Sequence, residues 1–446
     1  MEYNINDFRF TYPESRTIIA WRGRHEICRG ERILLSGASG SGKSTLLYGL
    51  MGLIPENVYG KIQGDILYRG KSIIHYPEQI KGKAGLILQN PAAQMLCRSV
   101  KEELAFGLEN KRFAVNEIRN QISEWSQRLG IEELLERETS SLSGGEKQKV
   151  TLLSILMTHP DVLMLDEPTA FLDPESALEI MSIIKDYQAE KTLIFVEHNL
   201  NYLRDIITRN LHLDTQGEVI DQAAESIKWQ SPLPHLKRTT TGKILLKLDN
   251  IRFSFSDKEL LTGINLEIRQ GEIIAIRGRN GSGKSTLLRI ISGLQKKYTG
   301  EIILQGEKIT TKGSRILNND IGMLFQNPEN HFLYNNIEQE LSENIITGLQ
   351  EEFLGKKQQS PFTLSEGEKR RLSTAIVCNV DKRILLLDEP TFGQDTINKQ
   401  KLIKLLGSLR DKGLGIIIVS HDNAFLQALS TRTFELKAGK LQQIAE

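Results

Sequence analysis

The feature that most constrains this chain is a glycine-rich motif that occurs twice, each time after a short apolar run. The first copy reads GASGSGKST over residues 37–45, and the second reads GRNGSGKST over residues 278–286. When a strand runs into such a loop and then into a helix, backbone N–H groups converge at the helix N-terminus and form an anion site. The pattern Gly-x-x-x-x-Gly-Lys-Ser therefore predicts a phosphate-binding loop in each half of the chain.

Further motifs follow each loop in the same order: a glutamine, then LSGGE or LSEGE, then LDEPT, and last a histidine after an apolar run. Lys284 lies 241 residues after Lys43, and Asp388 lies 222 residues after Asp166. A repeat of this length indicates duplicated domains rather than a solenoid. We predict a first domain over residues 1–220, a linker over 221–243 and a second domain over 244–446.

The apolar patterns predict the fold class of each half. Alternating residues at 8–12 and 251–255 are typical of antiparallel strands. Apolar runs at 162–165 and 193–196 are typical of parallel strands that are buried on both faces. We therefore expect two tandem α/β domains of the P-loop NTPase type, each with a mixed sheet, an antiparallel edge and a helical subdomain.

The helical subdomain is expected between the glutamine and the LS-x-GE motif. Apolar residues recur there at helical spacing and predict one buried helix face; they are Val115, Ile118, Ile122, Trp125 and Leu129. The second half has less room, because residues 328–363 must contain the equivalent of residues 91–142.

Composition narrows the functional classes. The formal net charge of +1 over 446 residues gives no overall field toward nucleic acid or anionic lipid. Cys28, Cys97 and Cys378 lie too far apart for a metal or redox motif, so we expect buried free thiols. No apolar run approaches the roughly 20 residues of a membrane-spanning helix. Any membrane part is therefore expected on another polypeptide.

The loop residues have distinct expected roles. Lys43 and Lys284 are expected near the β- and γ-phosphates, and Ser44 and Ser285 are expected to bind Mg²⁺. The other loop residues expected to contact the nucleotide are Gly37, Ser39, Gly40, Gly42, Thr45, Gly278, Asn280, Gly281, Gly283 and Thr286.

Acidic residues follow a buried strand in each half. Asp166 and Asp388 end these strands, where a carboxylate can hold Mg²⁺ directly or through water. The adjacent Glu167 and Glu389 are candidates to orient or deprotonate an attacking water. The alternative is that each carboxylate pair only caps a helix.

The late histidines, His198 and His421, each follow an apolar strand and are predicted to contact the γ-phosphate and the attacking water. A purely structural histidine is the alternative for each position. The motifs at Ser143 and Ser365 precede basic helices, and an ordinary helix cap has the same appearance. Because the start of a helix attracts anions, we interpret Ser143, Gly145, Ser365 and Gly367 as a second phosphate-binding element in each half.

Taken together, these motifs resemble the ATP-binding subunits of ABC transporters. The motif set occurs twice, so the resemblance covers nearly the whole chain. The resemblance implies a head-to-tail arrangement in which Lys43 and Glu167 share one ATP with Ser365. Lys284 and Glu389 would share the other ATP with Ser143. It also assigns several residues by motif: Gln89 and Gln326 to Mg²⁺ and the water, Tyr12 and Phe255 to adenine stacking, and Asp173 and Asp395 to communication between the halves. Core packing is the alternative for the two aromatic residues.

A narrower resemblance, to the energy-coupling-factor importers of vitamins and metal ions, rests on QNPAAQ (89–94), VKEELAFGLEN (100–110), QNPEN (326–330) and PTFGQD (390–395). It implies a transmembrane coupling protein and a small membrane substrate-binding protein as partners, and a peripheral place on the cytoplasmic face of the membrane. Met95, Leu96 and residues 332–334 are candidates to line the docking groove, with packing inside the subdomain as the alternative.

The halves also differ. The second has Glu366 where the common signature has glycine, and only 39 residues separate Gln326 from Ser365, against 54 from Gln89 to Ser143. We expect two ATP sites of unequal rate, with the Lys43–Ser365 site the slower.

Two rival functions are a soluble tandem ATPase of the ribosome or nucleic acid, and the tandem ATPase of a sugar importer. No nucleic-acid partner is expected, because the linker is short and no basic cluster is present.

Overall fold

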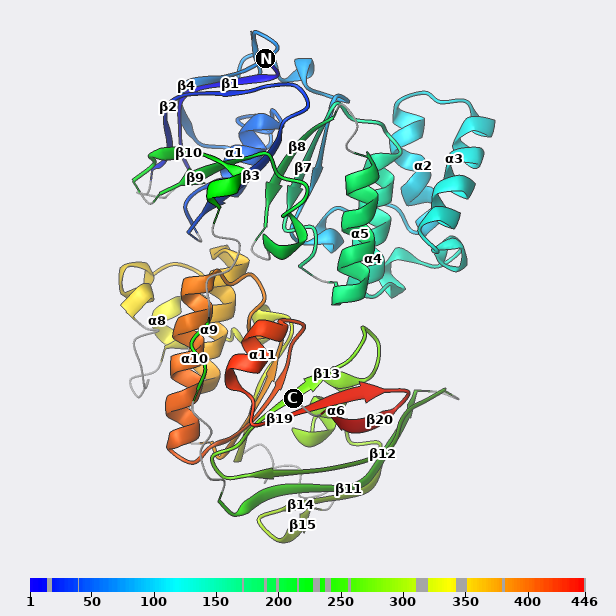
Figure 1. Cartoon of the computed structure of the whole chain (residues 1–446), viewed down its shortest axis with the longest axis vertical. Coiled ribbons are helices and arrows are strands. Elements are labelled where there is room, and N and C mark those ends of the chain that lie inside the picture. The colour runs from blue at the N-terminus through cyan, green and yellow to red at the C-terminus, as the bar shows by residue number, and fades with distance from the viewer. Residues whose placement is uncertain are drawn as a thin grey trace. The chain divides into compact units, whose positions relative to one another are not determined.

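The computed structural model describes residues 1–446 except 14–17, 39, 171, 188–190, 198–199, 215, 228–232, 237–241, 256–257, 310–319, 342–350, 379–381 and 445–446. The chain divides into two compact units, Met1–Ser231 and Pro232–Glu446 (Figure 1).

Much of the segment expected to be a linker contributes to the units. Strand β10 (Val219–Ala223) extends past residue 220. Further along, Leu236 belongs to the second unit, because its N–H donates to the Ala428 carbonyl at 2.8 Å. A Cβ on Gly407 would lie 2.9 Å from Leu236 Cδ2, so the two are tightly packed. The domain bounds inferred from the sequence remain a prediction.

The first unit contains two described sheets, in the orders β2-β1-β4-β5 and β10-β9-β3-β8-β7-β6. Its strands are β1 (Tyr3–Thr11), β2 (Ile19–Ile27), β3 (Arg32–Gly37), β4 (Lys61–Tyr68), β5 (Lys71–Ser72), β6 (Ala84–Ile87), β7 (Val162–Asp166), β8 (Thr192–Val196), β9 (Arg209–Leu213) and β10. Its α-helices are α1 (Lys43–Leu50), α2 (Val100–Asn110), α3 (Val115–Arg128), α4 (Gly144–Leu156) and α5 (Pro174–Tyr187). Its 3₁₀ helices are η1 (Pro77–Gln79), η2 (Pro91–Ala93), η3 (Glu132–Leu134), η4 (Thr139–Ser141), η5 (Leu200–Tyr202) and η6 (Ala224–Ser226).

The second unit repeats this plan, with described sheets in the orders β12-β11-β14-β15 and β16-β17-β18-β13-β19-β20. Its strands are β11 (Ile244–Phe255), β12 (Lys258–Arg269), β13 (Ile273–Arg277), β14 (Thr299–Leu304), β15 (Glu307–Ile309), β16 (Ile321–Leu324), β17 (Ile384–Asp388), β18 (Gly415–Val419), β19 (Arg432–Lys437) and β20 (Lys440–Ile444). Its α-helices are α6 (Lys284–Ile291), α8 (Ile337–Glu340), α9 (Glu366–Cys378), α10 (Thr396–Asp411) and α11 (Asn423–Leu429). Its 3₁₀ helices are η8 (Pro328–His331), η9 (Glu351–Lys356) and η10 (Pro361–Thr363).

The expected sheet types are confirmed. β1 pairs antiparallel with β2 and β4, and β11 pairs antiparallel with β12 and β14. In the larger sheets β3, β6, β7, β8 and β9 pair in parallel, as do β13, β16, β17, β18 and β19, while β10 and β20 add antiparallel edges.

Both faces of the larger sheet are buried in each unit. Along β7, Leu163 and Leu165 belong to the core shared with α4 and α5. Their neighbours Val162 and Met164 belong to a different core, shared with α1 and the antiparallel sheet. In Figure 1, α4 and α5 accordingly lie beside β7 and β8. Because alternate residues point to opposite faces, a strand covered on both sides reads as an uninterrupted apolar run.

The helical subdomain of the first unit forms as expected, with one correction. Ile118, Ile122 and Trp125 are buried on α3, and Leu129 is buried just after it. Val115 was expected on the same face but is 65% exposed. Val115 is the first residue of α3, and the amphipathic pattern cannot show where the surface that the helix covers ends.

A second correction concerns the cysteines. All three are free, and Cys378 is buried as expected, but Cys28 is exposed. Cys28 directly follows the last residue of β2, so it falls in a turn rather than in the core. Composition alone cannot separate these two environments for a small thiol side chain.

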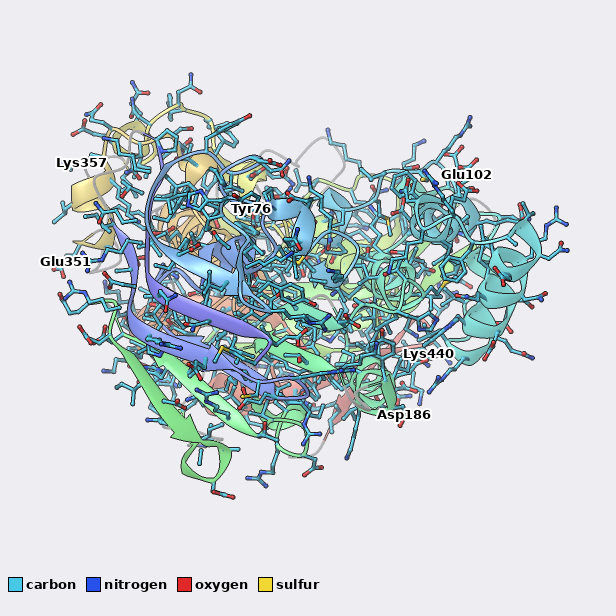
Figure 2. All side chains as sticks on the ribbon, turned by 90° about the horizontal axis from the view of Figure 1, so that it is seen from above. Tyr76, Glu102, Asp186, Glu351, Lys357 and Lys440 are labelled. Carbon is cyan, nitrogen blue, oxygen red and sulfur yellow. The ribbon has the colours of Figure 1, made fainter. Side chains whose placement is uncertain are left out.

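Charged side chains cover the outside of the molecule. Glu102, Asp186, Glu351, Lys357 and Lys440 are exposed examples, of which Glu351 and Lys357 lie at the outline of the view in Figure 2. Among the described residues, no helix is long and apolar enough to cross a membrane.

The buried sheet generates a stability prediction. Leu163→Ala removes a side chain of 0% exposure from the middle of β7, so we expect a loss of about 2–5 kcal/mol in the free energy of unfolding. Tryptophan fluorescence during urea unfolding is the measurement, because Trp21 and Trp125 are buried in the first unit. The control Leu178→Ala, at a 60% exposed position of α5, should change stability by less than about 0.5 kcal/mol.

Candidate functional site

Each glycine-rich loop joins the third strand of its unit to a helix, and the loop lysine folds back over the loop. Lys43 Nζ donates to the carbonyls of Gly37 and Ala38 at 3.0 and 2.9 Å. Lys284 Nζ donates in the same way to Gly278 and Arg279, at 2.6 and 2.9 Å. Both lysines are buried, so each positive charge is already held within its loop.

Glycine is required at two places in each loop. Gly42 and Gly283 precede their helices at φ 100°, in the left-handed region that glycine adopts without strain. A Cβ on Gly37 would lie 2.3 Å from the carbonyl oxygen of Leu213, and one on Gly278 would lie 2.6 Å from that of Leu436. Such approaches to a backbone atom leave no room for a side chain.

The loops fit a bound phosphate chemically. The hydroxyl oxygens of Ser41 and Ser282 are buried and make no hydrogen bond within the described part of the chain. A buried hydroxyl without a partner is costly, and a phosphate oxygen would satisfy it. These two serines were not singled out from the sequence, although both occupy the same variable position of the motif.

The strand-end acids lie where the sequence predicted them. Asp166 and Asp388 are the last residues of β7 and β17, and both are buried. Glu167 and Glu389 follow at φ 51°, and their N–H groups donate to Val196 at 2.7 Å and Val419 at 2.8 Å. A non-glycine residue held in the left-handed region costs about 1–3 kcal/mol, and such strain concentrates at functional sites.

In the second unit the loop, the acids and the late histidine meet. The His421 N–H donates to Glu389 Oε2 at 3.2 Å, and His421 Nε2 lies 3.5 Å from Glu389 Oε1 and 3.1 Å from Asn280 Oδ1. Burial and the neighbouring negative charge of Asp388 raise the pKa of Glu389 above its ordinary value. A carboxyl group whose pKa is raised in this way is suited to exchanging a proton with water.

The donor set also fits a magnesium ion. The hydroxyl of Ser285 lies close enough to the carboxylate of Asp388 to oppose the rise in its pKa, so two oxygen ligands of the expected site are near each other. Burial raises the pKa of Asp388, and the positive charges of Arg370, Lys284 and Arg289 oppose that shift. Mg²⁺ typically takes one or two protein oxygens and completes its shell with phosphate and water.

In the first unit, the residue at the position that corresponds to Arg289 is uncharged. Tyr48 and Arg289 occupy the same position after their loops, five residues beyond Lys43 and Lys284. Burial raises the pKa of Tyr48 to about 12, and the negative charge of the nearby Asp166 adds to the shift. A neutral phenol thus stands near one strand-end acid and a guanidinium near the other, a difference the sequence motifs did not indicate.

The other predicted site residues that the structure describes lie at strand ends, in the loops that follow them or in the first helical turns. Tyr12 is half-buried, and its hydroxyl lies 3.0 Å from Thr45 Oγ1, whereas Phe255 is 74% exposed. Ser44, Gly40, Gly281 and Thr286 lie in their loops and first helical turns, and Gln89 and Gln326 lie between strands β6 and β16 and the following 3₁₀ helices. Ser39 and His198 lie outside the described residues.

The two signature serines each stand at the start of a helix. Ser143 caps α4, accepting from the Glu146 N–H at 3.3 Å while its own N–H donates to the Glu146 carboxylate at 2.7 Å. Ser365 and Glu368 make the same pair of bonds at the start of α9, at 3.4 and 2.9 Å. Helix capping is thus present at both motifs, and it leaves the phosphate-binding interpretation of Ser143, Gly145, Ser365 and Gly367 a prediction.

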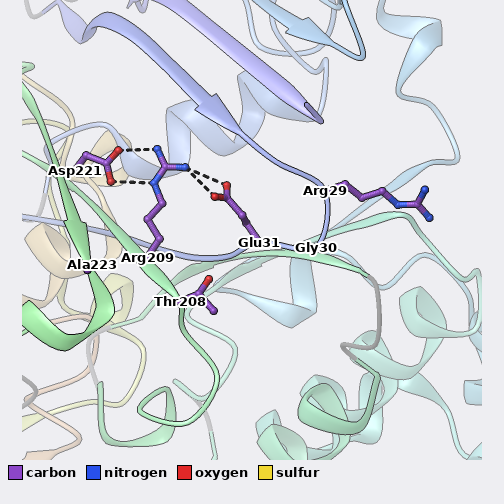
Figure 3. A pocket seen from close by; sticks show the side chains of 7 residues that line it. All are labelled: Arg29, Gly30, Glu31, Thr208, Arg209, Asp221 and Ala223. Atoms are coloured by element: carbon purple, nitrogen blue, oxygen red, sulfur yellow. Dashed lines mark hydrogen bonds and ion pairs between the residues drawn. The ribbon is translucent and has the colours of Figure 1, made fainter.

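A shallow hollow in the first unit does not belong to this site (Figure 3). Arg209 is among its lining residues and is paired with Asp221 at 2.7 Å and with Glu31 at 3.0 Å. Because two carboxylates already bind this arginine, its charge is used within the fold.

Comparison with known proteins identifies relatives along the full length. The sequence model described as "ABC transporter" matches residues 24–170 and 261–392. The provisionally named HMP/thiamine import ATP-binding protein YkoD of Bacillus subtilis (strain 168) is 31% identical over 94% of this chain and 86% of its own. A provisionally named ABC transporter ATP-binding protein of Sulfurisphaera tokodaii is 32% identical over 99% of this chain and 97% of its own.

Among solved structures, an archaeal ribosome recycling factor aABCE1 in complex with ribosomal stalk protein aP1 has a TM-score of 0.67 at 19% identity. The matched region covers 98% of this chain and 89% of the chain in that structure. A model of ribosome-bound archaeal Pelota and ABCE1 has a TM-score of 0.71 at 20% identity, covering 98% and 78%. At these identities the similarity shows that the fold is shared.

The neighbourhood of Gln326 generates a pH prediction. His331 Nε2 accepts from the Phe325 N–H at 2.9 Å, and burial, with the nearby Arg370, lowers the pKa of His331 to about 4. At the corresponding place in the first unit, Gln94 accepts from the Leu88 N–H at 2.7 Å. Since the folded protein keeps His331 neutral while the unfolded chain protonates it near pH 6.5, its contribution to stability is present above pH 6.5 and is lost as the pH falls toward 4.

His331→Gln should keep the backbone bond and remove this pH dependence, which is worth at most about 3 kcal/mol. Urea unfolding of both proteins at pH 7.5 and pH 5 is the measurement. If the difference in unfolding free energy between His331→Gln and the parent protein is the same at pH 7.5 and at pH 5, protonation of the imidazole is not responsible for the pH dependence.

Proposed function

Because this chain belongs to the ABC transporter family, we propose that it is the ATPase subunit of a membrane importer of the energy-coupling-factor type, for a vitamin or a metal ion. The chain is an ATPase of two tandem ABC domains, and the family binds ATP with Mg²⁺. The name of the B. subtilis relative, which refers to import, supports the transport direction.

The observation that carries the proposal is an exposed leucine held in the same way in both units. Leu96 is 72% exposed and Leu333 is 83% exposed, each seven residues after its glutamine. A large apolar side chain in water is unfavourable, and repetition at matching positions indicates a contact surface. Their neighbours Met95 and Phe332 pack against apolar clusters instead, so the predicted docking residues divide into two kinds.

A buried carboxylate fixes each leucine. Glu103 Oε2 accepts from the N–H groups of Leu96 at 2.9 Å and Cys97 at 2.8 Å. Glu340 Oε1 accepts from Leu333 and from Tyr334, the latter at 2.6 Å. Both glutamates are buried, and burying a charge is expensive unless hydrogen bonds compensate. The loop is therefore held in one conformation, which favours the binding of a rigid partner such as a helix of the transmembrane coupling protein.

The remaining assignments complete the proposal. Asp166, Asp388, Ser44 and Ser285 would hold Mg²⁺, with Gln89 and Gln326 near the water and Glu167 and Glu389 as its bases. Each ATP would be shared between the loop of one half and the signature of the other. The protein would work at the cytoplasmic face of the membrane, with a small substrate-binding membrane protein as the second partner.

Separate substitutions of the two bases test the unequal sites. Glu389→Gln should remove more than half of the total ATP turnover, and Glu167→Gln less than half, because removing a general base slows its own site by roughly 10²–10⁴-fold. Steady-state phosphate release by the full chain is the measurement. Equal losses in the two variants would contradict the asymmetry.

The docking surface has its own test. The double variant Leu96→Ser with Leu333→Ser should abolish co-purification with small integral membrane proteins from detergent-solubilised membranes, while basal ATPase activity stays. Leu178→Ser, on the exposed side of α5, is the matched control and should leave co-purification intact. Recovery of ribosomes instead of membrane proteins with the unmodified chain would favour the soluble ribosomal function, and undiminished membrane recovery by the double variant would disprove this docking surface.

A further inference from the structure

We propose that Arg370 is a positioning residue of the second half, which fixes the backbone at Gln326 against the signature helix α9. The inference rests on the proposed assignment of Gln326 and Glu389 to one ATP site. Nothing in the motifs requires an arginine at this place, because the first half has Gln148 there, five residues after its signature serine.

The contacts of Arg370 are unusual for an arginine. Its side chain is 1% exposed, and it donates through Nη1 to the Phe325 carbonyl at 2.6 Å and through Nη2 to the Gln326 carbonyl. The rigid fork of a guanidinium can hold two successive carbonyls at fixed positions, which a flexible ammonium cannot do. One buried side chain thereby connects α9 to the two peptide groups on either side of Gln326.

Nearby charges make this burial tolerable. Burial lowers the pKa of Arg370 to about 10, and the negative charges of Glu389 and Asp388 oppose that shift. The guanidinium also lies 6.0 Å from the ring centroid of Phe392. Arg370 therefore binds the glutamine segment and is also close enough to the strand-end acids to compensate part of the negative charge at that end of β17.

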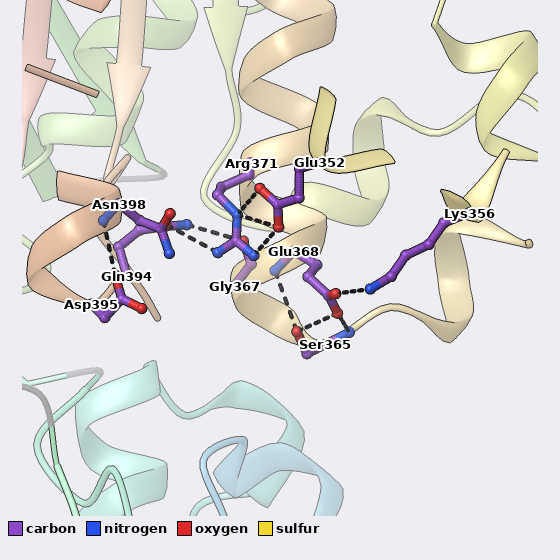
Figure 4. Close-up of polar contacts among 9 residues, drawn as sticks. All are labelled: Glu352, Lys356, Ser365, Gly367, Glu368, Arg371, Gln394, Asp395 and Asn398. Carbon is purple, nitrogen blue, oxygen red and sulfur yellow. Dashed lines mark hydrogen bonds and ion pairs between the residues drawn. The ribbon is translucent and has the colours of Figure 1, made fainter. Parts of the chain in front are cut away.

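The residues on either side of Arg370 extend the connection. Lys369 pairs with Glu329 of η8. Arg371 donates to Glu352 at 2.8 Å and to Gln394 at 3.3 Å, and Gln394 in turn donates to the Gly367 carbonyl at 3.0 Å (Figure 4). Consecutive side chains thus join α9 to the glutamine segment, to η9 and to the loop before α10. Rotation of this helix would break contacts in all three directions.

The first half is built differently at the same place. Gln148 is 1% exposed, and its Oε1 has no hydrogen-bond partner within the described part of the chain. Lys149, the counterpart of Arg371, pairs with Glu179 of α5 at 2.7 Å. A neutral amide cannot supply the charge or the paired N–H donors of a guanidinium.

The consequence concerns the geometry of hydrolysis. If Gln326 helps to hold the attacking water, its backbone must stay in place during hydrolysis. A displacement of about 1 Å in a positioned group can reduce a rate by roughly 100-fold. Arg370 should therefore affect turnover at the second site, which is the one that contains Lys284, Gln326 and Glu389. It should have little effect on ATP affinity there.

The experiment places Arg370→Gln in two backgrounds of the full chain. In Glu167→Gln, where the remaining activity comes from the second site, we expect kcat to fall at least about ten-fold while KM for Mg·ATP changes less than about two-fold. In Glu389→Gln, where the remaining activity comes from the first site, the same change should alter kcat by less than about two-fold.

Two further variants separate positioning from charge and from stability. Arg370→Lys keeps the buried charge but cannot bridge both carbonyls, so its kcat in the Glu167→Gln background should also fall. Arg410→Gln removes another buried arginine of the second unit, whose Nη2 lies 2.8 Å from Asp411. It should lower the unfolding temperature and leave kcat unchanged.

Full turnover in Arg370→Lys, an equal loss in Arg410→Gln, or an equal loss in both backgrounds would overturn the role of Arg370. Residual hydrolysis at the parent rate in the double variant Glu167→Gln with Glu389→Gln would instead overturn the assignment of the bases. The two failures are therefore distinguishable.

Discussion

The burial of the larger sheet on both of its faces is the constraint from which the arrangement of the site follows. Along β7 and β17 every side chain enters an apolar core, so a carboxylate can appear only where the strand ends. Asp166 and Asp388 stand at those ends, and the glycine-rich loops leave β3 and β13 in the same sheets. Polar chemistry is confined to one edge of each sheet because the rest of its surface excludes water.

The two units share this framework and differ in the charges placed around it. Arg289 and Arg370 bring positive charge to Asp388, whereas Tyr48 stands near Asp166. Since a low-dielectric site makes each charge more influential, two guanidinium groups can change the behaviour of a carboxylate without touching the nucleotide. Differences in rate between two such sites therefore need no difference in the motifs themselves.

The sequence was sufficient to predict the motif residues, the two-faced strands and the order of the elements, because these depend on short spacings. It could not predict contacts that join distant segments. Glu103 looks like any glutamate on an amphipathic helix, and only the folded chain places its carboxylate at the N–H of Leu96. Similarly, Met95 and Leu96 are adjacent apolar residues in a loop, and no periodicity there shows which of them is buried. The exposure of Val115 was missed because the helix pattern does not show where its covered surface ends.

The paired acceptors Gln94 and His331 carry a wider consequence. Both complete the same backbone hydrogen bond, one with an amide oxygen and the other with an imidazole nitrogen. At this position both halves keep a backbone N–H group that needs a side-chain acceptor. Any side chain that can reach this N–H group and accept its hydrogen bond can take that role. Divergence between the halves is therefore better measured by the donors and acceptors that each residue satisfies than by counting identical letters: by that measure Gln94 and His331 are equivalent, whereas Gln148 and Arg370 are not.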